Sequence, residues 1–196
     1  MASSARALLF DIDGVLIDSE ESNMAAYRKI LASCGYDVPI QRIKETMLGG
    51  TTHRILETLA PGSTPELRDK MVGMIVQNVP NTFLEFKKTA TLDLVPELSD
   101  AYLIAAVTNR RKSAINVLNH FGVLGYFSAI KTADDYPPKP SPEMILGACA
   151  ALGVKPAESV FFGDHLVDLE AGQKAGVKTH IIGAGCTRDE LLSLLG

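Results

Sequence analysis

The chain is poor in cysteine, carries no excess of basic charge and has no apolar run long enough to cross a bilayer. Its three cysteines are an odd number without metal-ligand spacing, which argues against a disulfide framework. The formal net charge is −4 at pH 7 and the basic residues are scattered, which argues against nucleic-acid binding and polybasic membrane binding. We expect a reduced, soluble, cytoplasmic protein, because acidic residues follow the N-terminal apolar run too early for a signal peptide.

No internal repeat and no low-complexity segment occurs in the 196 residues. The 46% of hydrophobic residues is enough for one full core, or for one domain that carries a modest insert. Because the overall charge is slightly negative, an anionic substrate would have to be held by local groups or by a metal.

The most informative stretch runs from residue 8 to residue 19, where an apolar strand ends in Asp11, Asp13 and Gly14. Side chains alternate along a strand, so Asp11 and Asp13 share one face if the chain stays extended. Both would then lie at the carboxyl end of a buried strand, where open α/β sheets bind ligands. Two adjacent acids repel each other, and a hard cation such as Mg²⁺ relieves the repulsion. An Asp-Gly turn is the alternative, whereas the spacing does not fit a calcium-binding loop.

Apolar periodicity predicts helices through the next part of the chain, with no strand signal between residues 18 and 88. Glycine and proline mark the ends of these helices. The expected helices cover residues 20–32, 41–47, 51–59 and about 65–80.

Strands alternate with helices in the second half of the chain. The expected strands cover residues 102–107, 127–132, 159–163 and 177–182, and the helices 110–120, 143–152, 166–175 and the C-terminus. This alternation predicts an α/β fold with a doubly wound, mostly parallel, Rossmann-like sheet. We therefore expect a catalytic core of residues 1–17 and 89–196, with residues 18–88 inserted as an all-helical cap.

Polar side chains follow three of the expected strands, and a lysine lies in a proline-stiffened loop. Parallel strands place their carboxyl ends at one edge of the sheet, so these side chains are expected to converge. Together they supply a carboxylate nucleophile, a second carboxyl for proton transfer, a hydroxyl and a lysine for phosphate, and acids for a metal. The set is Asp11, Asp13, Thr108, Asn109, Lys139, Asp164 and Asp168.

Each member of the set also has a purely structural interpretation. Thr108 or Asn109 could cap the following helix. Lys139 could be a solvated loop lysine, and Asp164 and Asp168 could be a cap and an exposed helix face.

Four segments, taken together, resemble the motifs of the haloacid dehalogenase-like hydrolase superfamily over nearly the whole chain. They are residues 11–19, 107–109, 139–142 and 163–168. The helical insert is similar to the cap of the phosphoglycolate phosphatase and β-phosphoglucomutase branch. One departure is that residues 89–100 lack the proline-glycine turn that relatives usually show there, and they offer few leucines where relatives have a leucine-rich helix.

The resemblance implies a role for each matching residue. Asp11 would attack the substrate phosphorus and form an aspartyl-phosphate. Asp13 would protonate the leaving oxygen and then activate the hydrolytic water. The Asp11 carboxylate, the Asp13 backbone carbonyl and Asp164 would bind Mg²⁺, and Asp168 would support the metal waters or Lys139.

The resemblance also implies how a phosphoryl group would be held. Thr108, Lys139 and backbone amides near Gly14 and Asn109 would bind its oxygens. In the cap, Gly50, Thr51 and Arg54 lie at a loop-to-helix junction where related caps contact the substrate, and His53 is a further candidate. The alternative there is a flexible loop followed by a helix start.

These implications favour a Mg²⁺-dependent phosphatase of a small phosphorylated metabolite, such as phosphoglycolate, a sugar phosphate, a nucleotide or pyrophosphate. The alternatives are a phosphomutase and a non-catalytic regulatory protein on the same fold. A dehalogenase is disfavoured because it needs neither a proton from Asp13 nor Mg²⁺ at Asp164. We expect no nucleic-acid or membrane partner, and a monomer or a small homo-oligomer.

Overall fold

The computed structural model describes residues 5–47, 52–78 and 85–195. The chain divides into two compact units, and each is described by itself. The core unit comprises Met1–Asp18 and Lys87–Gly196, and the helical unit comprises Ser19–Phe86. Gly50 and Thr51, two of the expected substrate-contacting residues, lie outside the described residues.

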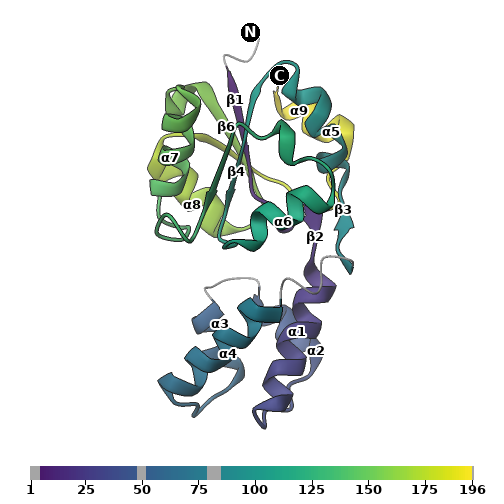
Figure 1. Ribbon diagram of the computed structural model, residues 1–196, viewed down its shortest axis with the longest axis vertical. Coiled ribbons are helices and arrows are strands. Elements are labelled where there is room, and N and C mark those ends of the chain that lie inside the picture. The colour runs from purple at the N-terminus through teal and green to yellow at the C-terminus, as the bar shows by residue number, and fades with distance from the viewer. Residues whose placement is uncertain (1–4, 48–51, 79–84, 196) are drawn as a thin grey trace. The chain divides into compact units, whose positions relative to one another are not determined.

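The core unit is built on a five-stranded sheet in which all strands are parallel (Figure 1). The strand order is β5-β4-β1-β6-β7, so the first strand of the chain is the central one. Such a strand is covered on both faces and must be apolar throughout, and the four residues of β1 are fully buried. The predicted parallel α/β sheet is therefore confirmed. The strands are β1 (Ala7–Phe10), β4 (Leu103–Thr108), β5 (Ala129–Thr132), β6 (Ser159–Gly163) and β7 (Lys178–Ile181).

Helices cover both faces of this sheet (Figure 1). On one face lie α7 (Glu143–Leu152) and α8 (Leu166–Ala175), which close a core around Leu9, Val107 and Phe161. On the other face lie α5 (Ala90–Ser99), α6 (Ser113–His120) and α9 (Arg188–Leu195). Short 3₁₀ helices, Leu124–Tyr126 and Pro156–Glu158, precede β5 and β6.

Helix α5 was not expected, because its sequence has few leucines and Pro96 lies inside it. A proline in a helix removes a backbone hydrogen bond. Four apolar side chains of α5 are buried and offset that loss: Leu92, Leu94, Val95 and Leu98. Thr89 caps the helix, since its hydroxyl accepts from the Leu92 N–H at 3.2 Å and donates to the Val15 carbonyl at 2.7 Å.

A short antiparallel ribbon joins β2 (Ile17–Asp18) to β3 (Lys87–Lys88). The expectation that residues 18–88 contain no strand was therefore wrong at both ends. Two-residue strands are too short to show a period-2 pattern, so the sequence carried no signal for them.

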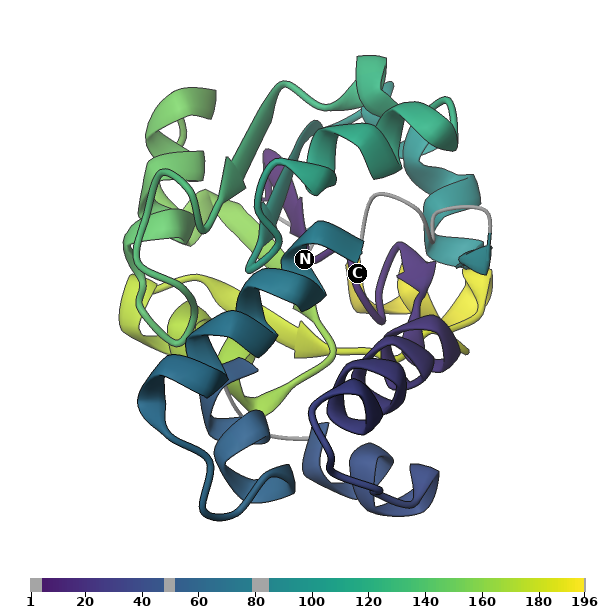
Figure 2. The same ribbon diagram turned by 60° about the horizontal axis from the view of Figure 1, so that its bottom comes forward.

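The described residues of the helical unit form four helices (Figure 2), which enclose an apolar core of their own. The core includes Tyr27, Leu31, Ile43, Leu56 and Met71. The helices are α1 (Glu20–Ser33), α2 (Ile40–Met47), α3 (Thr52–Leu59) and α4 (Pro65–Asn78). In the parts of the chain that the structure describes, no helix has the length and apolar character needed to span a membrane.

Candidate functional site

Asp11 lies immediately after β1, at the carboxyl edge of the sheet. Its N–H donates to the carbonyl of Phe162 in β6 at 2.9 Å, which continues the pairing of the two strands. The Ile12 N–H donates to Asp11 Oδ1 at 2.7 Å. Only 8% of Asp11 is exposed. Its backbone and one carboxylate oxygen are therefore fixed by neighbouring main chain.

Lys139 is a buried lysine that contacts Asp11, and it is not a solvated loop residue. Its Nζ lies 3.1 Å from Asp11 Oδ2 and 2.6 Å from Asp168 Oδ1, and donates to the Val107 carbonyl at 3.1 Å. The contact with Val107 is a hydrogen bond, and the contacts with Asp11 and Asp168 are ion pairs.

Asn109 contacts the backbone of Lys139. Its Oδ1 accepts from the Lys139 N–H at 2.7 Å, and its Nδ2 donates to the Lys139 carbonyl at 3.2 Å. The Asn109 side chain therefore holds the lysine loop against the end of β4. A direct contact of Asn109 with a phosphoryl group stays a prediction.

Asp168 links the lysine to the loop after β6. While its Oδ1 faces Lys139, its Oδ2 accepts from the N–H groups of Asp164 and His165 at 3.1 and 3.0 Å. The structural alternative, with Asp164 as a cap and Asp168 on an exposed helix face, is wrong: His165 is the N-cap of α8, and Asp168 is 1% exposed. A Cβ on Gly163 would lie 2.3 Å from Asp168 Cβ, so this approach requires glycine.

The chain turns immediately after Asp11, and this turn differs from the extended geometry that was expected. Strand β1 ends at Phe10, and Gly14 adopts a left-handed φ of +75°. The Asp-Gly turn named as the alternative is therefore present, and it still places Asp13 near enough to raise the pKa of Asp11.

Thr108 is buried at the end of β4, where its hydroxyl accepts from the Arg110 N–H at 3.1 Å.

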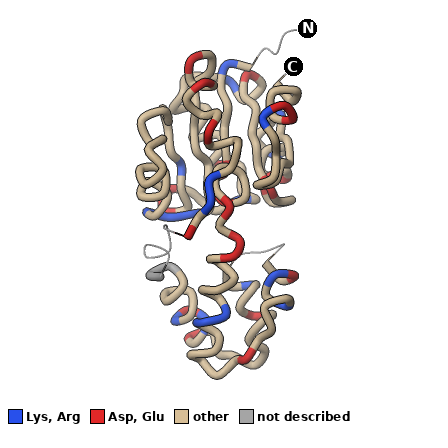
Figure 3. Tube along the Cα trace, turned by 90° about the vertical axis from the view of Figure 1, so that its right-hand side faces the viewer, with Lys and Arg blue, Asp and Glu red and all other residues tan. Residues whose placement is uncertain are grey.

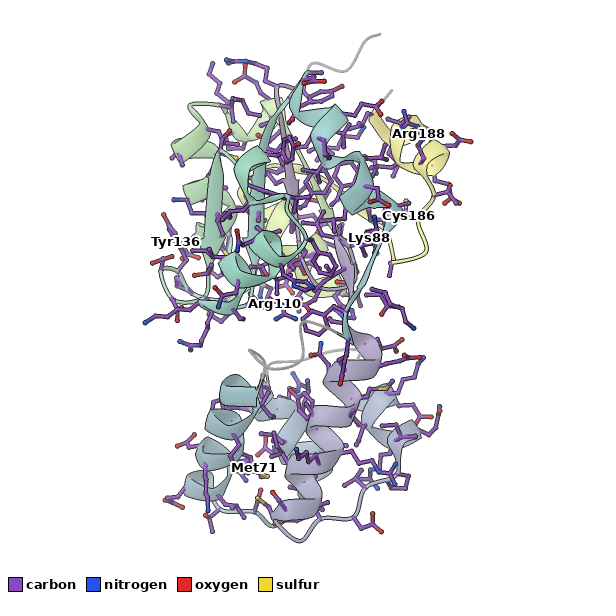
Figure 4. All side chains as sticks on the ribbon, turned by 45° about the vertical axis from the view of Figure 1, so that its right-hand side comes forward. Met71, Lys88, Arg110, Tyr136, Cys186 and Arg188 are labelled. Atoms are coloured by element: carbon purple, nitrogen blue, oxygen red, sulfur yellow. The ribbon has the colours of Figure 1, made fainter. Side chains whose placement is uncertain are left out.

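Arg110 is the site residue that sequence reasoning missed. Its guanidinium forms a bidentate ion pair with Asp13, with Nε to Oδ2 at 2.5 Å and Nη2 to Oδ1 at 2.6 Å. Figure 4 labels Arg110 at the end of the core unit where β4 ends and α6 begins. A single arginine 97 positions after its partner gives no periodic signal, so the sequence offered no way to find the pair.

The site carries more negative than positive charge. It gathers four carboxylates and two cations in the contacts described: Asp11, Asp13, Asp164, Asp168, Lys139 and Arg110. Elsewhere the two signs are interspersed along the chain (Figure 3). When all four carboxyls are ionised, the excess of two negative charges equals the charge of one divalent cation.

Burial, with the neighbouring carboxylates adding to it, raises the pKa values of two carboxyls. Burial raises the pKa of Asp11 to about 7, with Lys139 opposing this and Asp168, Asp13 and Asp164 adding to it. Burial and the neighbouring Asp168 likewise raise the pKa of Asp164 to about 7. Burial disfavours the charge of Lys139, but its two ion pairs outweigh that and raise the pKa of its ammonium.

The donor set fits a hard divalent cation. Carboxylate oxygens of Asp11, Asp164 and Asp168 all lie within 4.8 Å of one another. Asp164 Oδ1 is buried without a hydrogen-bond partner among the described residues. Such an atom is costly to bury, and a cation would satisfy it. Asp11 and Asp168 each also contact Lys139 and backbone N–H groups, so the unpartnered oxygen of Asp164 is the strongest indication of a ligand.

Arg54 belongs to the helical unit, near the start of α3. It lines a hollow of about 600 Å³ together with His53, Glu57, Pro65, Arg68 and Asp69. His53 Nε2 lies 2.9 Å from Asp69 Oδ1 at the surface. The role of Arg54 toward a substrate stays a prediction.

Comparisons with known proteins agree with the motif pattern. Residues 8–182 match the family model described as haloacid dehalogenase-like hydrolase. The chain is 32% identical over 178 residues to the pyrophosphatase PpaX of Bacillus velezensis, covering 88% of this chain and 81% of that protein. It is 30% identical over 187 residues to a phosphoglycolate phosphatase of Aquifex aeolicus, covering 89% and 83%.

A solved structure extends the comparison to the fold. The β-phosphoglucomutase of Clostridium difficile superposes with a TM-score of 0.72 at 24% identity, over 96% of this chain and 87% of that one. The resemblance drawn from four motifs is confirmed, because the family model spans all four of them. The chain belongs to the haloacid dehalogenase-like hydrolases.

Proposed function

We propose that the protein is a Mg²⁺-dependent phosphatase of small phosphorylated metabolites that acts through an aspartyl-phosphate on Asp11. The observation that carries the proposal is the contact of a buried Asp11 carboxylate with Lys139, beside the unsatisfied oxygen of Asp164. A carboxylate and a phosphate dianion repel each other, so a nucleophilic carboxylate needs cations close by. Lys139 is one such cation, and the carboxylates of Asp11 and Asp164 are candidate ligands for a second one.

The first step would form a bond between an Asp11 oxygen and phosphorus while the ester P–O bond breaks. The leaving oxygen takes a proton from Asp13, and Lys139 and the Thr108 hydroxyl stabilise the phosphoryl oxygens. A Mg²⁺ ion held by Asp11, Asp164 and the Asp13 carbonyl would neutralise charge on the phosphoryl group.

The second step would release phosphate. Water attacks phosphorus, Asp13 accepts the proton of that water, and the P–O bond to Asp11 breaks. The same two residues thus serve both steps, and Asp13 ends in the protonation state in which it began.

The relatives suggest the substrate class. One is named a pyrophosphatase and another a phosphoglycolate phosphatase, so small metabolites with a phosphoryl group are the candidates, and sugar phosphates and nucleotides belong in the same panel. We further propose that residues 18–88 act as a cap that recognises the leaving group of the substrate. Arg54 or the Gly50-Thr51 segment would contact that group.

The test is a phosphatase screen of the purified full chain against such metabolites, with Mg²⁺ or with EDTA. Release of inorganic phosphate that requires Mg²⁺ and is lost in Asp11→Asn supports the proposal. Conversion of a sugar phosphate to its isomer, in the presence of a trace of bisphosphate, identifies a mutase instead. Activity that survives EDTA, or the absence of turnover and of calorimetric Mg²⁺ binding, overturns the proposal.

A further inference from the structure

Arg110 and Asp13 form an ion pair in which both partners are held by other contacts. We propose that Arg110 is a positioning residue: its guanidinium fixes the orientation of the Asp13 carboxyl for proton transfer to the leaving oxygen. The inference rests on the proposed function, in which Asp13 is the acid and base.

The backbone of Arg110 is anchored on both sides. Its N–H donates to the Thr108 hydroxyl at 3.1 Å, and its carbonyl accepts from the Ala133 N–H at 3.1 Å. These contacts tie Arg110 to the ends of β4 and β5, two neighbouring strands of the sheet. The arginine side chain therefore starts from a fixed point of the scaffold.

The side chain itself is almost fully enclosed. Only 7% of the Arg110 side chain is exposed, against 32% of the Asp13 side chain. A buried guanidinium is costly unless a carboxylate pairs with it, so the geometry of the pair is strongly favoured. Two parallel N–H···O bonds also fix the plane of the carboxylate, which a single point charge would not do.

The backbone of Asp13 is equally constrained. Residue 13 bridges to Ile17, and the Gly14 N–H donates to the Ile17 carbonyl at 2.8 Å. With the main chain fixed by this turn and the carboxylate fixed by Arg110, the Asp13 side chain keeps little torsional freedom.

The ion pair engages both oxygens of the Asp13 carboxylate. A carboxylate offers about four acceptor sites, and the two N–H groups of Arg110 take one on each oxygen. Misplacing a catalytic group by about 1 Å can cost ~10²-fold in rate, so the orientation that Arg110 imposes bears directly on proton transfer.

A purely structural clamp would stabilise the turn without affecting proton transfer in particular. The two roles differ in their dependence on the leaving group. An alkyl phosphate needs a proton on its leaving oxygen, whereas p-nitrophenyl phosphate leaves as a stable anion. A positioning defect should therefore reduce kcat/KM for the alkyl ester far more than for the aryl ester.

The experiment measures kcat/KM for both esters in wild type, Arg110→Gln, Arg110→Lys, Asp13→Asn and the double variant Arg110→Gln/Asp13→Asn. For Arg110→Gln we expect a loss of ~10- to 100-fold on the alkyl ester and only a few-fold on the aryl ester. Arg110→Lys restores charge without the fork and should recover only part of the loss. The double variant should be no slower than Asp13→Asn, because Arg110 acts through Asp13.

Arg111→Gln is the matched control. Arg111 is the next residue in the chain and makes an exposed ion pair with Asp134 at 3.0 Å. Its substitution should not change the ratio of kcat/KM for the alkyl ester to kcat/KM for the aryl ester. Thermal unfolding of each variant checks that it is folded. If Arg110→Gln does not fold, Arg110→Lys and its double variant with Asp13→Asn take its place.

Equal losses of Arg110→Gln on both esters, or losses that multiply with those of Asp13→Asn, would overturn the inference while leaving the proposed function intact. Near-normal activity of Asp13→Asn on the alkyl ester would instead contradict the proposed function.

Discussion

Gly14 lies so close to Asp164 that a Cβ at position 14 would stand 1.9 Å from Asp164 Oδ2. The φ of +75° at Gly14 disfavours any other residue as well. The first and the fourth motif of the chain are therefore packed directly against each other.

Gly14→Ala should displace the Asp164 carboxylate and weaken Mg²⁺ binding by at least ~10-fold. Isothermal titration calorimetry with MgCl₂ measures this. Gly122→Ala is the matched control, because Gly122 has a similar φ of +72° with open space where its Cβ would lie. Unchanged Mg²⁺ affinity in Gly14→Ala would show that Asp164 is not a ligand.

Asp11→Asn should lower phosphate release by at least ~10³-fold, because an amide cannot attack phosphorus as a carboxylate does. The variant should remain folded, since the substitution keeps the shape of the side chain and removes a buried charge from an acidic cluster. Phosphate release and thermal unfolding are measured on the same preparation. A folded Asp11→Asn protein with near-normal turnover would refute the nucleophile assignment.

The metal-free protein should lose stability as the pH rises from 6 to 8. Asp11 and Asp164 have native pKa values of about 7, well above the ordinary value of 3.8. The native state therefore holds protons that the unfolded chain has lost, and their stabilising effect disappears as the pH rises through 7. Each group contributes ~1 kcal/mol of this loss, which corresponds to a lowering of Tm by a few °C.

Mg²⁺ should reverse this trend, because it binds the deprotonated carboxylates. The increase in Tm on adding MgCl₂ is expected to be larger at pH 8 than at pH 6, by differential scanning calorimetry. In Asp11→Asn the pH slope of the metal-free protein should be shallower. A metal-free Tm that rises between pH 6 and pH 8 would contradict the assigned direction.

Asn109→Ala should lower stability by ~1–3 kcal/mol and lower kcat, because it removes both hydrogen bonds that hold the Lys139 backbone. Denaturant unfolding and steady-state kinetics measure the two effects. Asn116→Ala, at an exposed position of α6, is the control and should be neutral. Loss of kcat without loss of stability would instead favour a direct contact between Asn109 and the phosphoryl group.

The parts of the fold that the sequence predicted are those with a strong local pattern. Residues 159–163 and 166–175 form β6 and α8 at the expected bounds, because the strand is a continuous apolar run and glycines end the helix. Helix α5 was missed because Pro96 contradicts the local preference, and the burial of its apolar side chains outweighs it. Tertiary packing of these side chains thus outweighs the low helix propensity of proline, and a local sequence pattern does not show tertiary packing.

The candidate site divides in the same way. Asp11 and Asp164 were predicted to converge because each follows an expected parallel strand, with Asp168 one helical turn after Asp164 and Lys139 in a proline-stiffened loop, and the structure brings the four side chains together. The partner of each side chain was not predictable. Rotamers and loop packing decide which carboxylate Lys139 contacts and which one Arg110 holds. Neither can be predicted from the spacing of residues in the sequence.

Lys139 Nζ already contacts three oxygens, one each from Asp11, Asp168 and Val107. The phosphoryl oxygens must compete with these three oxygens for the lysine while the bond to Asp11 forms. Under the proposed function, esterification turns Asp11 from an anion into a poor acceptor, and the lysine proton that faced it becomes available to the phosphoryl group. The interaction between Lys139 and the phosphoryl group would thus strengthen as the bond between Asp11 and phosphorus forms.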